Sequence, residues 1–192
     1  MKSTIVLAIA MTGIIFTACG GKKDSKATGD SKGSTATVSG VNPAIEAELN
    51  NTFKMINDGF APGTAEMSKI SDFDKEAKPF MMNEKNTGNF KTLIDNEEIN
   101  IEKFYSANYT KPGVLYDIRF SASDKTLQKD TGTVDINLDA YVQVLDKAFG
   151  VKGVKGTESG FEDAIVWKTD KMTGWITPAS NSFTLLIRKD LH

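Results

Sequence analysis

Few residues of this chain could carry out covalent chemistry. The 192 residues include one cysteine, Cys19, and one histidine, His192, which is the last residue. A cysteine or histidine metal cluster and a Ser-His or Cys-His catalytic pair are therefore not expected within one chain. Carboxylates are the remaining route to acid-base catalysis, and the candidates are Glu97, Glu98, Glu102, Asp135 and Asp139. The same positions suit a solvated strand face and a helix N-terminus, so we expect no enzyme, no metal and no cofactor.

Charge gives no reason to expect nucleic acid as a partner. The chain has 23 basic and 25 acidic residues, and only Arg119 and Arg188 could make forked phosphate contacts. A glycine-rich stretch over residues 150–160 carries Lys152 and Lys155. Because it follows an expected helix and precedes an expected strand, it has the wrong order for a phosphate-binding loop. We expect a mobile connector whose two lysines could contact a partner.

The two tryptophans have different expected roles. Trp167 shares a strand face with Ile165 and is expected in the core. Trp175 stands beside Gly174 at the expected start of a strand, and on the surface it could anchor a partner. The candidate partner-binding residues are thus Trp175, Lys152 and Lys155.

The first nineteen residues form an export pattern. Lys2 precedes the apolar run 5–16, and small residues then lead to Cys19. A helix rises 1.5 Å per residue, so this run would reach about 18 Å, short of the roughly 30 Å hydrocarbon core of a bilayer. A permanent membrane span is therefore not expected.

The residues Phe16-Thr17-Ala18-Cys19 resemble the lipobox of bacterial lipoproteins, although the family usually has leucine where Phe16 stands. The resemblance implies a cleaved signal peptide over residues 1–18 and a bilayer anchor through acylated Cys19. It places the protein in a bacterial cell envelope, in the outer membrane. An ordinary signal peptide is the alternative. Residues 19–41 are then the lipidated cysteine and a flexible tether rich in glycine and serine.

Residues 42–192 are expected to form a single α+β domain. Asn42-Pro43 predicts the start of a helix that ends near residues 58–59. A second helix is predicted over 64–78, with a capping box at 71–74 and a stop at Pro79. Alternating residues predict strands near 90–94, 99–105, 114–120, 134–138, 165–169 and 183–187, and a further helix ends at Gly150. These elements predict an antiparallel sheet with helices packed on one face.

The expected function is that of a non-enzymatic envelope lipoprotein that binds an unidentified envelope protein or glycan. One alternative is an envelope glycan hydrolase that uses paired carboxylates across a pocket. The other comes from the order of helix, loop, Trp167 and terminal hairpin, which faintly resembles small inhibitor-like lipoprotein domains. The resemblance implies blocking of an enzyme or assistance in outer-membrane assembly. An exposed concave sheet bearing aromatic residues would favour it.

Overall fold

The computed structural model describes residues 40–81, 88–126, 137–157, 163–179 and 182–189. All of them belong to one compact unit, residues 36–192. The expected signal peptide, Cys19 and most of the tether lie outside the described residues, as do Asp135, His192 and the expected strand residues 134–136.

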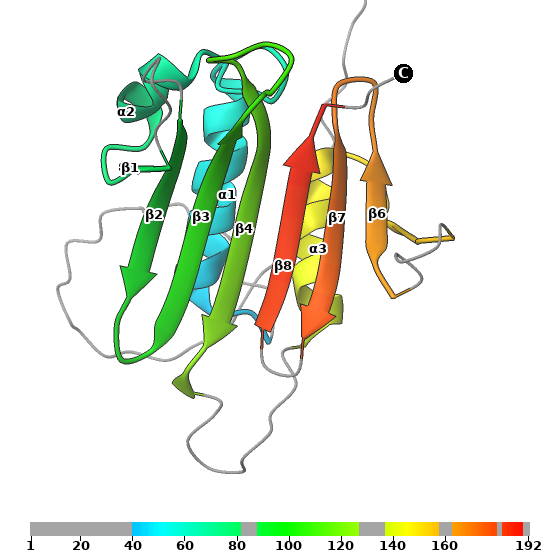
Figure 1. The fold of residues 1–192 in the computed structure, drawn as a ribbon. Coiled ribbons are helices and arrows are strands. Elements are labelled where there is room, and N and C mark those ends of the chain that lie inside the picture. The colour runs from blue at the N-terminus through cyan, green and yellow to red at the C-terminus, as the bar shows by residue number, and fades with distance from the viewer. Residues whose placement is uncertain (1–39, 82–87, 127–136, 158–162, 180–181, 190–192) are drawn as a thin grey trace, which may run out of the picture. The chain divides into compact units, whose positions relative to one another are not determined.

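One antiparallel sheet of eight strands runs through the domain, in the order β1-β2-β3-β4-β8-β7-β6-β5 (Figure 1). The strands are β1 (Lys78–Phe80), β2 (Asn89–Asp95), β3 (Ile99–Ala107), β4 (Leu115–Asp124), β5 (Val154–Lys155), β6 (Ile165–Lys168), β7 (Thr173–Ala179) and β8 (Ser182–Arg188). The predicted antiparallel α+β fold is confirmed.

Two helices lie behind this sheet, α1 (Pro43–Asn57) and α3 (Leu138–Phe149) (Figure 1). The Asn42 side chain accepts a hydrogen bond from the amide of Ala44, which caps α1 as the sequence predicts. Helix α3 ends at Gly150, whose φ of 72° gives the left-handed cap that glycine favours. Within the described ranges, no helix combines the length and hydrophobicity needed to cross a bilayer.

The two halves of the domain repeat one order of elements. Helix α1 precedes strands β1–β4, and helix α3 precedes strands β5–β8. The halves meet where β4 pairs with β8 in antiparallel register, and each four-stranded part extends outward from that seam. An antiparallel pair is related by a local two-fold axis, so the domain has an approximate two-fold arrangement centred on the β4–β8 seam.

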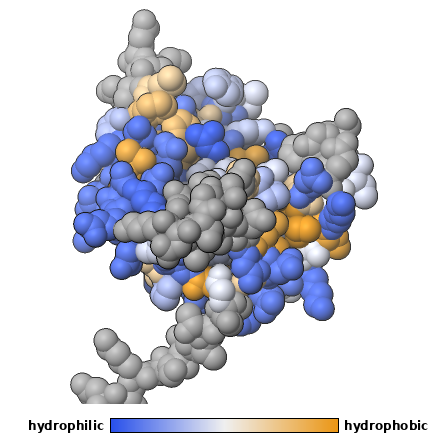
Figure 2. All heavy atoms as spheres, turned by 90° about the horizontal axis from the view of Figure 1, so that it is seen from below, coloured by the Kyte–Doolittle hydropathy of each residue, from blue (hydrophilic) through white to orange (hydrophobic). Residues whose placement is uncertain are grey.

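The core fills the space between the helices and the sheet. Phe53 of α1 meets Phe149 of α3 edge to face at 4.8 Å, and Phe149 stacks on Trp167 at 5.4 Å. Trp167 is fully buried, as predicted. Gly174 permits this packing, because a Cβ there would lie 2.2 Å from Cζ of Phe149. Seen from below, most of the surface not drawn in grey is hydrophilic, with separate hydrophobic patches (Figure 2).

The prediction of a long second helix over 64–78 is wrong. The segment contains the 3-10 turn η1 (Met67–Lys69) and the four-residue helix α2 (Ile70–Phe73). Its first part instead pairs with the end of the β3–β4 hairpin, where the amide of Met67 donates to the carbonyl of Gly113 and Glu66 bridges Val114. These backbone bonds replace helical ones.

Three smaller predictions, for Asp74, Pro79 and Leu138, are also wrong. Asp74 is the C-terminal cap of α2 and not part of a capping box. Pro79 lies inside β1, an outermost strand of the sheet, where the missing amide hydrogen is tolerated. Leu138 begins α3 and does not end a strand. Within the expected connector 150–160, Val154 and Lys155 form β5 because they pair with Val166 and Ile165.

Candidate functional site

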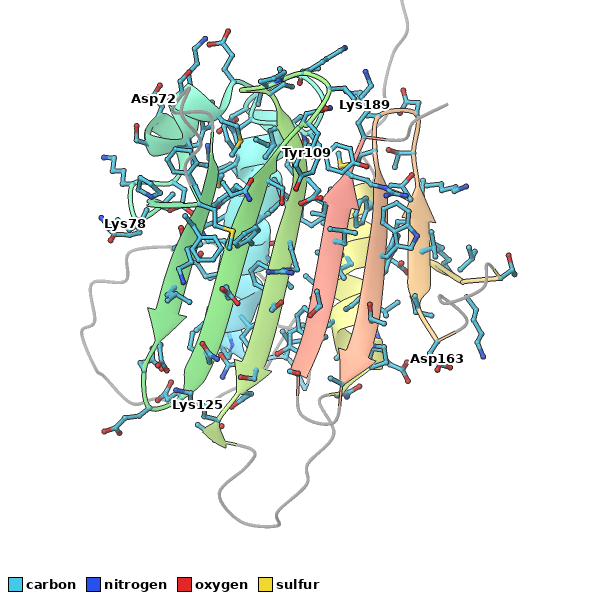
Figure 3. The ribbon with its side chains drawn as sticks, viewed as in Figure 1. Asp72, Lys78, Tyr109, Lys125, Asp163 and Lys189 are labelled. Atoms are coloured by element: carbon cyan, nitrogen blue, oxygen red, sulfur yellow. The ribbon has the colours of Figure 1, made fainter. Side chains whose placement is uncertain are left out.

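The two long helices cover one face of the sheet, and none of the described helices covers the other (Figure 3). Side chains along a strand alternate between the faces, so the pairing register assigns each one. The other side, here called the open face, carries the strand residues out of phase with those that face the helices, among them Lys78, Phe80, Lys91, Leu93, Asp95, Glu102, Phe104, Asp117, Arg119, Val154, Val166, Lys168, Thr173, Trp175, Thr184, Leu186 and Arg188. Val166, Thr173 and Trp175 on this side are nevertheless buried.

One line of directly paired residues crosses the open face, with one residue from each strand. Each member is the register partner of the next. The middle row, as we call it, is Lys78, Lys91, Phe104, Arg119, Leu186, Trp175, Val166 and Val154. Apart from the two lysines at one end, it consists of apolar, aromatic and arginine side chains.

Aromatic rings and cations contact one another in and beside the half of the middle row that runs from Lys78 to Arg119. Arg119 lies over the ring of Phe104, with its guanidinium carbon 4.8 Å from the ring centroid. Phe104 meets Phe80 edge to face at 5.2 Å, and the ammonium of Lys91 lies 4.8 Å over Phe80. Each cation–π contact at an exposed site contributes about 0.5–1 kcal/mol, so these side chains restrain one another.

A third cation–π contact lies at Trp175, in the other half of the middle row. The guanidinium carbon of Arg188 lies 4.5 Å from the centroid of the Trp175 ring. Trp175 is on the open face, but it is only 7% exposed, less than a free surface tryptophan. A partner at this position would therefore touch Arg188 as well as the indole edge.

A hollow of about 220 Å³ lies beside this pair. Its lining consists of Val154, Lys155, Gly156, Thr157, Val166, Lys168 and Trp175. The structure thus brings together two of the residues that the sequence singled out, Trp175 and Lys155. Lys152, three residues before Lys155, is exposed and does not line the hollow.

The acidic residue nearest to the two arginines on the open face is Asp117, which is the register partner of Arg188. Burial raises the pKa of Asp117 above its ordinary value, although a hydrogen bond with Ser106 and the charges of Arg119 and Arg188 act the other way. Neither arginine forms an ion pair with a carboxylate in the part of the chain that the structure describes.

A buried polar cluster lies on the helix-facing side, and the sequence reasoning missed it. The ammonium of Lys103 is 3.1 Å from Oε2 of Glu48 and 3.0 Å from Oδ2 of Asp74. Asp74 also accepts hydrogen bonds from Tyr105 at 2.6 Å and Thr92 at 2.8 Å. The sequence does contain one sign of this cluster, because Lys103 is in phase with the buried residues of its strand. Its partners could not be identified, because they are distant in the sequence.

The charges and hydrogen bonds of this cluster favour the ionised form of Asp74. Burial alone would raise the pKa of Asp74, but the hydrogen bonds from Tyr105 and Thr92 and the charge of Lys103 hold it below 3.8. A general acid of a glycosidase needs the opposite shift. Burial also raises the pKa of the Tyr105 hydroxyl, and the negative charge of Asp74 adds to that effect.

A pocket of about 410 Å³ opens over the buried cluster, between α1, α2 and strands β2 and β3. Of the carboxylates predicted as possible catalysts, the four that the structure describes do not line it. Glu97 and Glu98 are exposed between β2 and β3, Glu102 is on the open face, and Asp139 is exposed in the first turn of α3. Among the described residues, no three or more ligating side chains are grouped to hold a metal ion.

Comparison with known proteins assigns no family. No protein-family model, curated protein or solved structure matches this chain.

Proposed function

We propose that this protein is a lipid-anchored lipoprotein of a bacterial cell envelope, held in the outer membrane, whose domain binds another envelope protein without catalysing a reaction. The binding surface is the open face. The observation that carries this proposal is the middle row, in which Phe104, Arg119, Leu186 and Trp175 lie side by side on an uncovered sheet. Aromatic and arginine side chains are the residue types that dominate binding energy at protein interfaces.

The geometry favours a protein over a glycan as the partner. A sugar stacks on an open aromatic ring face, whereas guanidinium groups lie over the rings of Phe104 and Trp175. The middle row spans eight strands, which at the usual strand spacing is about 34 Å. That extent suits a protein interface of standard size, about 800 Å² on each partner.

Between the two expected alternatives, the open face supports the inhibitor-like or assembly-accessory lipoprotein. That alternative called for an exposed concave sheet with aromatic residues, and Phe80 and Phe104 supply aromatic rings at half-buried positions of the open face. The glycan-hydrolase alternative does not find its general acid in Asp74, because that carboxylate is held ionised by Lys103.

The anchor rests on the sequence around Cys19 and has its own test. The intact mass of the mature natural protein should correspond to a chain that begins at Cys19 and carries acyl groups, and it should partition into detergent. A Cys19→Ser variant should lose the added mass and the detergent partitioning. An unmodified mature N-terminus would contradict the anchor.

The binding surface can be tested in cells by site-specific photo-crosslinking. A benzophenone amino acid replaces Leu93, an exposed residue of the open face, and the matched control replaces Gln143 on the exposed side of α3. We expect a discrete protein adduct from position 93 and none from position 143. Equal adducts from both positions, or no adduct from position 93, would contradict binding through the open face.

A further inference from the structure

The chain contains two arginines, and both lie on the open face beside the seam between the halves. Arg119 is on β4 and Arg188 is on β8, which pairs with β4. Arg119 lies over Phe104 of β3, and Arg188 lies over Trp175 of β7. The two guanidinium groups therefore diverge from the seam, one toward each half.

Phe104 and Trp175 hold equivalent positions in the two halves. Phe104 is the register partner of Arg119, Trp175 is the register partner of Leu186, and these two partners face each other across the seam. Three strand spacings separate the two rings, which is about 14 Å. The open face thus presents two similar arginine–aromatic pairs at a fixed separation.

The guanidinium N–H donors of both arginines have no hydrogen-bond acceptor among the described residues. A guanidinium has five N–H donors in a planar fork that matches a carboxylate. Within the described residues, neither Arg119 nor Arg188 forms an ion pair or a hydrogen bond with another residue. Stacking on the rings restrains each fork in place, so less entropy is lost when an acceptor binds.

The charge of the open face differs from that of the whole domain. Residues 42–192 contain 18 basic and 23 acidic residues. The open face, in contrast, carries five basic residues, Lys78, Lys91, Lys168 and the two arginines, against three acidic ones, Asp95, Glu102 and Asp117. A basic surface on an acidic domain is complementary to an acidic partner.

We propose that the protein bound by the open face presents two carboxylate groups about 14 Å apart, one to each arginine–aromatic pair. This inference rests on the proposed function and adds the chemistry of the partner. Each carboxylate accepts a forked pair of hydrogen bonds, from Arg119 in one half and from Arg188 in the other. Apolar side chains of the partner pack between them on Leu186.

The test uses random-peptide display against the purified full chain, followed by affinity measurements on the enriched peptides. We expect enriched peptides to contain Asp or Glu at two separated positions. Arg119→Gln and Arg188→Gln should each weaken binding at least tenfold. Arg119→Lys and Arg188→Lys should also weaken it, because lysine keeps the charge but loses the fork. The matched control Lys147→Gln, on the exposed side of α3, should bind like the wild type.

Several outcomes would overturn the carboxylate inference. These are a selection that returns no enriched peptide, peptides without excess acidic residues, and arginine variants with unchanged affinity. Equal competition by inorganic phosphate would instead indicate a phosphate-bearing partner. A different result would contradict the proposed function itself: peptide binding that is unchanged in both Leu186→Glu and Leu93→Glu. Circular dichroism and thermal melting establish that each variant is folded before its affinity is compared.

Discussion

At the scale of single residues, Lys103 is unusual because it is a buried lysine. It is 4% exposed, although lysine is almost never fully buried without a partner. Glu48 and Asp74 compensate its charge. Tyr105 and Thr92 also donate to Oδ2 of Asp74, and the amide of Glu76 donates to Oδ1. Each polar group of the cluster thus has a partner. Removing one member would leave a buried charge without its partner, and the cost of taking that charge out of water would no longer be offset.

Asp74→Asn should therefore destabilise the domain at neutral pH by about 3 kcal/mol, the usual cost of breaking a buried pair. Because the pKa of Asp74 is lowered in the folded state, its contribution is present above pH 3.8 and is lost as the pH falls through the folded value. The difference in unfolding free energy between wild type and variant should shrink accordingly. Urea denaturation at pH 7 and at pH 3 measures it.

The matched control is Asp72→Asn, which removes an exposed carboxylate from the same pocket. It should change the unfolding free energy by less than about 0.5 kcal/mol, as a surface substitution does. An Asp74→Asn variant as stable as this control would show that the ion pair with Lys103 contributes nothing.

At the scale of elements, the sequence predicted those whose signals are local. The cap at Asn42, the glycine stop at Gly150 and the alternation that leads to Tyr105 all lie within a few residues of what they determine. Prediction failed for 64–78 and for β5, because those segments take their backbone partners from Gly113 and Val166, far along the chain. Helical spacing alone does not reveal such pairing.

The contact between strand β7 and helix α3 gives a prediction at this scale. Gly174→Ala should destabilise the domain by about 1–3 kcal/mol, because the new methyl group would overlap the ring of Phe149. Thermal melting and urea denaturation measure the loss. Adding Phe149→Leu should restore part of it, since the smaller side chain makes room.

Gly150→Ala is the control for loss of glycine without overlap. No atom lies within 4 Å of a Cβ at that position, but its φ is 72°. The expected cost is about 1 kcal/mol from the left-handed backbone, and Phe149→Leu should not relieve it. If that second change rescued both variants equally, ring overlap would not be the cause in Gly174→Ala.

At the scale of the whole molecule, two four-stranded halves share one sheet and one core. The sequence predicted strands and helices but not this pairing of halves, because the order of strands in a sheet depends on contacts across the full chain. The candidate site shows the same limit. Trp175 and Lys155 were singled out from local composition, whereas Phe104, Arg119 and Leu186 join them only through the register of β3, β4 and β8.

The contact of Phe53 with Phe149 joins the helices of the two halves and should couple their stabilities. Each ring-to-alanine substitution should cost about 3–5 kcal/mol. In the double variant the cost should fall short of the sum by about 0.5–1.5 kcal/mol, the coupling of an edge-to-face pair. A double-mutant cycle by urea denaturation measures this coupling. Strict additivity would mean that the two helices are stabilised independently.

The outermost strands are three residues long in β1 and two in β5, and β1 contains Pro79 between its ends. A neighbouring molecule could add few backbone hydrogen bonds at either border, and proline offers none. Copies of the domain at high concentration should therefore resist growing into fibres through their sheet edges. Contacts with other molecules are left to side chains and not to peptide groups.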